Sequence, residues 1–363
     1  MNARKTAVLA ILLVWTVLTA AAWTLPAKEI SAAERRPLAQ FPQITEKSLS
    51  NGSFMEEFES YTLDQFPLRD AFRTAKSIFH QYVLGQRDNN GIYLTDGFAV
   101  QQEYPLELSS LGHAVSRFTH VYEKYLTDSA VSMAIVPDKG QYLAEESGHL
   151  ALDMERMLGY FAERMPWAAQ IDLRDALSAE DYYRTDTHWR QENLLEAAKT
   201  LCNALNVTAP DPGDYTKTAL DRPFYGVYYG QSALPLAPET MYLMESRLLS
   251  DCAVYDHESG KTVAVYDRTK LDSKDLYDVF LSGSRSLLTI ENPAGKPGKE
   301  LVVFRDSFGS AMIPLILTDY AKVTVVDIRY IHPDLLDRFV DFHGQDVLFL
   351  YSTLVLNNSE TIK

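Results

Sequence analysis

The pattern of hydrophobic and polar positions predicts helices that alternate with short buried strands. A helical spacing over residues 111–125 is followed by a short apolar run at 132–136. A second helical pattern over 150–165 then precedes an apolar run at 170–173. Because strands separated by helices pair in parallel, this order predicts an α/β fold with a mostly parallel sheet flanked by helices.

The same alternation resumes near the C-terminus. Leu301–Leu317 has a buried strand pattern followed, after a sharp turn, by apolar positions at helical spacing. Two further strands are predicted at 322–327 and 346–351, with a helix at 333–342 between them. These elements extend the predicted parallel sheet.

The remaining stretches have other patterns. Phe224–Leu234 is rich in aromatic residues and glycine, which fits either a sugar-binding cleft or tyrosine packing. We therefore predict four parts: a membrane anchor or signal segment at 1–25, an extended tether and helical region packed on the main domain at 26–128, the α/β core at 129–205 and 301–363, and a β-rich insertion at 206–300.

One helix before the core carries a long apolar stripe. Pro67 fits its first turn and Gly85 can end it. The residues of the stripe are Leu68, Phe72, Ala75, Phe79 and Tyr82. A stripe of this kind normally faces a core, so we predict that these side chains are buried.

The N-terminal segment is apolar enough to enter a membrane. Arg4 and Lys5 precede Thr6–Leu25, and about 20 apolar residues suffice to cross a bilayer. The length favours an uncleaved anchor with the basic end inside, although Ala20-Ala21-Ala22 would also fit a signal cleavage site. In both cases the remainder of the chain is exported.

The net charge of the chain limits the classes of molecule that it is expected to bind. The formal net charge is −15 without a Lys/Arg cluster, which argues against nucleic-acid binding. Carbohydrate or acyl-ester partners fit better.

The two cysteines, Cys202 and Cys252, do not form a disulfide scaffold. An exported compartment permits one bond between them, but buried thiols are the simpler expectation.

Two stretches carry candidate chemistry. Ser307 lies in the strand-to-helix turn of Leu301–Leu317, which would hold its hydroxyl clear of the sheet. Asp186 and His188 lie in the loop after the strand at 170–173. Because catalytic groups gather outside the carboxyl ends of parallel strands, these residues should meet as nucleophile, general base and orienting carboxylate.

Simpler interpretations of the same residues remain open. Ser307 could be a helix-capping serine, and His188 a packed loop histidine. A metal site is disfavoured because no second His/Asp pair of suitable spacing accompanies Asp186 and His188. A second Asp-x-His, Asp341 to His343, comes before a strand and should lie at the opposite edge of the sheet.

An acyl carbonyl attacked by Ser307 would also need donors for the developing oxyanion. The backbone N–H of Ser307 is the natural first donor. The second is open among Arg305, Arg184, the Tyr183 hydroxyl and a loop N–H such as that of Gly283.

Several of these motifs together resemble a known family. The motifs are ERRPLAQFP, DQFPLRDAF, NNGIYL-TDGF, AIVPDKGQYL, YYRTDTHW, FLSG and VVFRDSFGSAMIPL. In this order they resemble the DHHW family of exported bacterial proteins, which is related to the SGNH-hydrolase-like acetyltransferase domains of alginate O-acetylation proteins. Thr187 stands where the name-giving motif has its first histidine.

The resemblance implies an SGNH-hydrolase-like, flavodoxin-like fold with Ser307, His188 and Asp186 as a triad. It implies an extracytoplasmic O-acetyltransferase or O-acetylesterase acting on a cell-envelope or secreted polysaccharide, with no metal or organic cofactor. A membrane-bound acyl-donor protein is an expected partner if the reaction is a transfer. The alternative is a non-catalytic polysaccharide-binding or assembly subunit with the same fold.

Overall fold

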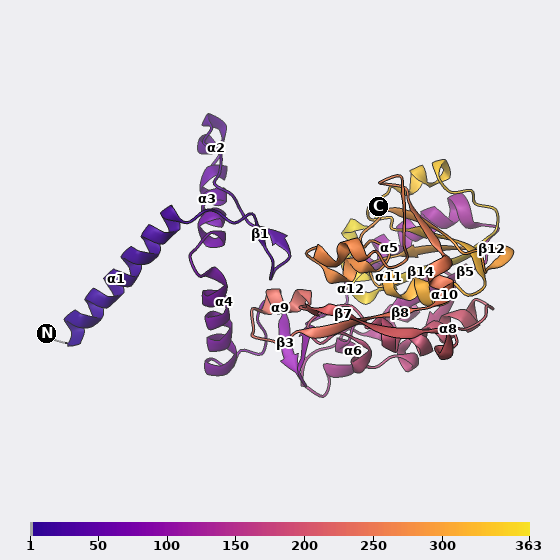
Figure 1. Ribbon diagram of the computed structural model, residues 1–363, viewed down its shortest axis with the longest axis horizontal. Helices are drawn as coiled ribbons and strands as arrows, with labels where there is room; N and C mark the ends of the chain where they lie inside the picture. Colours follow the sequence, from indigo (N-terminus) through magenta and orange to yellow (C-terminus); the bar gives the residue numbers. More distant parts are fainter. Residues whose placement is uncertain (1–2) are drawn as a thin grey trace. The chain divides into compact units, whose positions relative to one another are not determined.

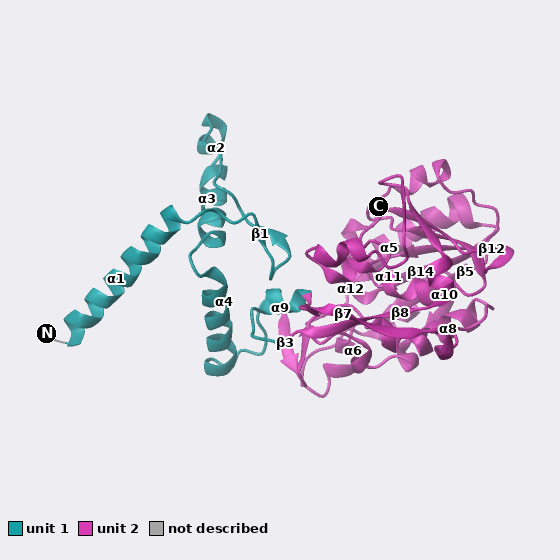
Figure 2. Cartoon of the chain, in the orientation of Figure 1, with its two compact units in different colours: residues 1–90, 227–236 teal, residues 91–226, 237–363 magenta. Residues whose placement is uncertain are grey.

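The computed structural model describes residues 3–363. The chain forms two compact units (Figure 2). Unit 1 contains the chain up to Asn90 together with Val227–Leu236, and unit 2 contains Gly91–Gly226 and Ala237–Lys363.

Unit 2 is built on an eight-stranded sheet with the order β10-β9-β11-β13-β12-β14-β5-β6. Its five strands from β13 to β6 are parallel, whereas β11, β9 and β10 extend one edge in antiparallel pairing. The strands are β5 (Val131–Val136), β6 (Ala169–Asp172), β9 (Ala253–Asp256), β10 (Lys261–Val263), β11 (Leu287–Glu291), β12 (Lys296–Arg305), β13 (Tyr320–Val326) and β14 (Asp346–Ser352). This mostly parallel sheet confirms the predicted α/β fold.

Strand β12 lies in the middle of the sheet because both of its faces are apolar. Successive side chains of a strand point to opposite faces. Leu301 and Val303 therefore belong to one hydrophobic core, and Val302 and Phe304 to the other. The register pairs Val303 with Val325 of β13 and with Leu348 of β14.

Helices cover both faces of this sheet (Figure 1). Helices α5 (Leu108–Val121) and α7 (Met154–Arg164) supply buried residues to the core that contains Val302, whereas α8 (Leu195–Ala204) supplies the other. Shorter helices are α6 (Gly140–Leu143), α10 (Arg247–Asp251), α11 (Gly309–Met312) and α12 (Thr353–Leu356). The helix predicted at 333–342 is a 3₁₀ helix over Pro333–Arg338.

Residues 206–300 contribute to unit 2 in two ways. Strands β7 (Thr216–Phe224) and β8 (Glu239–Glu245) form a separate two-stranded ribbon. Strands β9, β10 and β11 instead join the central sheet. Part of the stretch predicted as an insertion therefore lies within the core sheet.

Unit 1 begins with α1 (Ala3–Thr24), which is long and apolar enough to cross a membrane and has no buried residue. The stretch predicted as an extended tether contains β1 (Ile30–Ser31), β2 (Arg36–Pro37) and α2 (Glu46–Ser50). Helices α3 (Ser53–Asp64), α4 (Arg69–Ile78) and α9 (Val227–Ser232) complete the unit. In unit 2 a hairpin of β3 (Ile92–Thr95) and β4 (Phe98–Gln101) follows.

The apolar stripe of α4 is a correction to the sequence analysis. The prediction that it is buried is wrong, because Leu68, Phe72, Phe79 and Tyr82 are all exposed. The physical reason is that α4 is held by its polar face, where Arg69 and Arg73 form ion pairs with Glu34. The amphipathic pattern had indicated a helix correctly, but not the side on which it is attached.

Candidate active site

Ser307 lies in a tight turn directly after β12. Helix α11 begins only two residues later, at Gly309, where a Cβ would stand 2.8 Å from the Cβ of Arg305. The turn can therefore be this close only with glycine at that position. The helix expected from Ser310 onward is brief and continues as a 3₁₀ helix over Ile313–Ile316, which contains Pro314.

The carboxylate of Asp306 holds this turn in place through hydrogen bonds. Its Oδ1 accepts the N–H of Phe308 at 3.0 Å. Its Oδ2 accepts both the N–H and the hydroxyl of Ser352, at 2.7 and 2.6 Å. Because Ser352 is the last residue of β14, the carboxylate ties the turn that holds Ser307 to the neighbouring strand. A buried carboxylate with this many donors keeps the turn rigid.

The loop that carries Asp186 and His188 folds back on itself. Tyr182 and Trp189 form an isolated antiparallel bridge, and the N–H of Tyr183 donates to the carbonyl of His188 at 3.0 Å. The ammonium group of Lys139, which is fully buried, donates to the carbonyls of Tyr183 and Asp186, both at 2.7 Å. Lys139 thus holds the loop against the end of β5.

The structure brings Asp186, His188 and Ser307 together in one hydrogen-bonded chain. Asp186 Oδ1 lies 2.6 Å from His188 Nδ1 and also accepts the His188 backbone N–H at 3.0 Å. His188 Nε2 lies 2.8 Å from Ser307 Oγ. Asp186 is fully buried, whereas Ser307 is only partly covered. This arrangement is typical of an activated serine nucleophile: the carboxylate is buried, the imidazole links it to the hydroxyl, and the hydroxyl is accessible to solvent.

Aromatic contacts fix the plane of the imidazole. The ring of Tyr277 stacks on His188, with ring centroids 3.9 Å apart and an interplanar angle of 14°. On the same loop, Trp189 Nε1 donates to the carbonyl of Phe308 at 3.0 Å. This bond joins the histidine loop directly to the turn of Ser307. Burial raises the pKa of Tyr277 well above its usual range, so its hydroxyl keeps its proton.

The second Asp-x-His lies where the strand order predicts. Asp341 and His343 precede β14, and β14 runs parallel to β12, so they lie at the edge opposite Ser307. His343 Nδ1 contacts the backbone carbonyl of Asp341 at 3.1 Å, and not a nucleophile. This pair is part of a loop, as expected.

The four candidates for a second oxyanion donor have different surroundings. Arg305 is buried and its Nη2 donates to the carbonyl of Gly283 at 3.1 Å, while the N–H of Gly283 donates to Phe280 at 3.0 Å. Both candidate groups therefore already have intramolecular partners. Arg184 is half exposed and its guanidinium lies over a phenylalanine ring of β4. The Tyr183 ring is buried against Phe224.

The backbone N–H of Ser307 is different, because among residues 3–363 it has no hydrogen-bond partner. Because the backbone N–H of a nucleophilic serine is a usual oxyanion donor, we expect this N–H to be the first donor. The structure therefore leaves this donor available and leaves the identity of the second as a prediction.

The residues that support the site were not predicted from the sequence. Asp306 directly follows β12 and Lys139 comes three residues after β5, and a lysine or aspartate in a loop is ordinarily expected to be exposed. Gln191 was also missed: its side-chain N–H donates to the carbonyl of Ala311 at 2.9 Å, and its oxygen accepts the N–H of Met244 at 3.0 Å. The only available signal was that Lys139 and Asp306 stand at the carboxyl ends of predicted strands.

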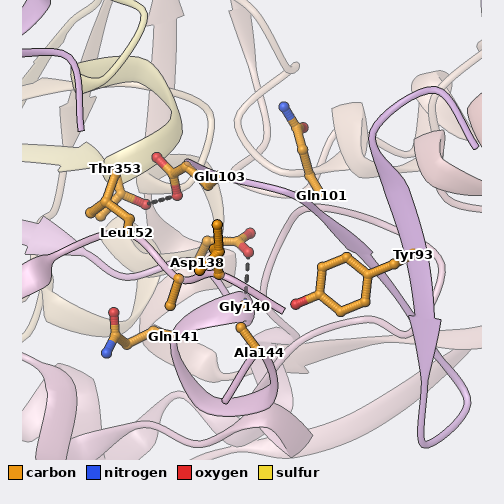
Figure 3. Close-up of a pocket in the computed structure, with 11 residues that line it drawn as sticks. Tyr93, Gln101, Glu103, Asp138, Gly140, Gln141, Ala144, Leu152 and Thr353 are labelled. Carbon is orange, nitrogen blue, oxygen red and sulfur yellow. Dashed lines mark hydrogen bonds between the residues drawn. The ribbon is translucent and has the colours of Figure 1, made fainter. Parts of the chain in front are cut away.

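A polar pocket lies at the same edge of the sheet (Figure 3). Thr353, next to Ser352, donates to Glu103 at 2.8 Å, and Asp138 accepts the N–H of Gly140 at 2.8 Å. Burial raises the pKa of Glu103 to about 8 and also raises the pKa of Asp138. Glu103 is therefore mostly protonated at neutral pH and can donate as well as accept.

Cys202 and Cys252 are both buried free thiols. Burial raises the pKa of Cys202 to about 12 and that of Cys252 to about 11. The permitted disulfide is therefore not formed, and both thiols are poorly reactive.

Several solved structures have the same fold. A DHHW family protein from Eubacterium siraeum is 23% identical, with a TM-score of 0.61 over 76% of this chain and 95% of the other. PatB1 from Bacillus cereus is 16% identical, with a TM-score of 0.60 over 75% and 98%, and a second PatB1 structure carries a sulfonyl adduct. The O-acetyltransferase domain of Pseudomonas putida AlgJ is 14% identical, with a TM-score of 0.45 over 74% and 92%.

The comparison with family models matches part of the chain. No curated protein matches the chain. The profile of the family described as DHHW protein matches residues 171–326, a stretch that contains Asp186, His188 and Ser307. The resemblance to the DHHW family is thereby confirmed over these residues.

Proposed function

We propose that the protein is an exported serine acyl-ester enzyme in which Ser307 is the nucleophile. The observation that supports this most directly is the chain of two hydrogen bonds from Asp186 through His188 to Ser307, at 2.6 and 2.8 Å. A helix-capping serine needs neither of these contacts, and a packed loop histidine does not need the contact with Ser307.

The geometry supports a two-step acyl transfer. His188 donates from Nδ1 to Asp186, so Nε2 is free to take the Ser307 proton as Oγ attacks the acyl carbon. The oxyanion forms beside the Ser307 N–H, and collapse expels the donor alcohol, which takes the proton from Nε2. A water molecule or sugar hydroxyl then attacks the acyl-enzyme, gives its proton to His188 and releases Ser307 with a proton.

The acyl group that fits the family resemblance is acetyl, and the acceptor is a hydroxyl of a cell-envelope or secreted polysaccharide. We place the enzyme outside the cytoplasm, held to the membrane by α1 as an uncleaved anchor. The length of α1 and the absence of buried residues in it support this placement. In the transfer reaction a membrane-bound acyl-donor protein would supply the acetyl group; in the esterase reaction water replaces the sugar.

The test combines turnover with covalent trapping. The purified protein is incubated with p-nitrophenyl acetate and, separately, with phenylmethylsulfonyl fluoride, a reagent chosen because the fold neighbour PatB1 has been seen with a sulfonyl adduct. We expect hydrolysis by the wild type, loss of hydrolysis in Ser307→Ala, and a sulfonyl mass increment on the peptide that contains Ser307.

The matched control is Ser310→Ala. Ser310 lies three positions further along the chain, in α11. It is buried, and its hydroxyl has no hydrogen-bond partner among residues 3–363. We expect this variant to retain both turnover and labelling. An unlabelled Ser307 together with equal turnover by the wild type and Ser307→Ala would refute the mechanism and favour a binding or assembly subunit.

A further inference from the structure

Helix α4 is attached to unit 1 by its polar face. Arg69 and Arg73 both form ion pairs with Glu34, and Arg73 also donates to the carbonyl of Gly230 at 2.9 Å. Ser77 is buried on the same side, where its hydroxyl accepts from Asn89 at 2.7 Å. The polar residues that would ordinarily face water are therefore used to hold the helix.

The opposite face of α4 and its π-helical extension, Phe79–Val83, is apolar and turned outward. We call these side chains the α4 apolar face. Their exposed fractions are Leu68 70%, Phe72 49%, Phe79 49%, Tyr82 70% and Val83 65%. A continuous row of large apolar side chains is unfavourable in water and indicates a partner with an apolar surface.

The neighbourhood of α4 in the chain indicates what this partner is. The second half of α1 and the segments before α4 line a groove of about 270 Å³. Its aromatic residues are Trp15, Trp23, Phe41, Phe58, Tyr61 and Phe66. Tryptophan and tyrosine at the end of a spanning helix are typical of the membrane–water boundary. Helix α4 begins three residues after Phe66, so it starts beside this boundary.

We propose that the α4 apolar face lies in the interfacial layer of the lipid bilayer into which α1 inserts. An interfacial helix has large apolar side chains on one face and a charged opposite face, as α4 does. Lys76 is exposed beside Phe72, where its ammonium group can reach lipid phosphates while its stem stays with the apolar face. The proposal rests on the proposed anchoring by α1 and does not depend on catalysis by Ser307.

The test measures the surroundings of single spin labels on the full-length chain in nanodiscs of phosphatidylethanolamine and phosphatidylglycerol. Labels are placed at Phe72→Cys and Phe79→Cys, with Asp70→Cys on the exposed polar side as the control. The native thiols are buried with raised pKa values, so they need not be removed. Collision rates are recorded with oxygen, which concentrates in lipid, and with a nickel chelate, which stays in water.

We expect the ratio of oxygen to nickel collisions to be severalfold higher at Phe72→Cys and Phe79→Cys than at Asp70→Cys. Equal ratios at all three positions would mean that the face is in water and would overturn the proposal. Low collision rates with both reagents at the two apolar positions would also overturn it, because the face would then be covered by protein, either a second copy or another part of the chain.

Discussion

Replacing Lys139 with methionine removes the buried cation that holds the histidine loop and keeps nearly the same volume. Burial lowers the pKa of Lys139 from its ordinary 10.5 to about 8. Between these values the unfolded chain binds more protons than the folded protein, so stability rises with pH over this window. The difference of about 2.5 pH units corresponds to roughly 3 kcal/mol at about 1.36 kcal/mol per unit.

The variant loses both the cost of the buried charge and the hydrogen bonds that the ammonium donates. The carbonyls of Tyr183 and Asp186 lose the bonds from the ammonium group, at about 1–3 kcal/mol each. Near pH 7 this loss and the roughly 3 kcal/mol regained from the buried charge largely offset each other. Above pH 10 the neutral amine of the wild type donates without that cost, so Lys139→Met should be less stable there by several kcal/mol.

The assay is the free energy of unfolding of both proteins from pH 7 to 10.5, by urea denaturation followed with near-ultraviolet circular dichroism. Lys199→Met, at an exposed lysine, is the control and should stay parallel to the wild type. We also expect kcat/KM of Lys139→Met to fall at least about tenfold, because a loss of about 1.4 kcal/mol in loop placement suffices. A stability difference between wild type and Lys139→Met that is constant with pH would refute the reasoning.

Two further predictions concern His188. Asp186→Asn replaces an acceptor by an amide that can present N–H to Nδ1, which favours the wrong tautomer, so kcat for p-nitrophenyl acetate should fall by roughly 10³–10⁴-fold; a loss of less than tenfold would contradict the orienting role. Tyr277→Leu removes the stacked ring, so kcat should fall with little change in KM, whereas Tyr277→Phe keeps the ring and should stay close to the wild type. Equal activity of the two Tyr277 variants would contradict positioning by the ring.

Much of the candidate site followed from strand order alone. Ser307 and the loop of His188 each come directly after a strand, and in a parallel sheet the strand ends meet at one edge. Asp341 and His343 precede their strand, which placed them at the other edge. Local pattern and one topological rule were therefore sufficient to bring together residues far apart in the chain.

The supporting residues did not follow from the sequence, because their roles depend on long-range contacts. From the sequence alone, Lys139 is expected to be a solvated lysine in a loop. In the structure it is buried and donates to the carbonyls of Tyr183 and Asp186. The antiparallel edge formed by β9, β10 and β11 was also not predictable from the sequence. The alternation of apolar and polar residues in these short strands is weak, and the strands with which they pair are decided only in the folded sheet. The outward direction of the α4 apolar face depends on Glu34, which is distant in sequence.

By itself, the sequence determined the alternation of helices and strands, the parallel core, the membrane-length segment and the edge at which Ser307 and His188 meet. These properties are periodic or topological and are encoded locally. Only the tertiary structure decided the 2.8 Å contact between His188 and Ser307, the buried support from Lys139 and the outward face of α4. These three features depend on which surfaces pack together. The periodicity of a sequence predicts that a helix has an apolar face, but it does not predict what covers that face.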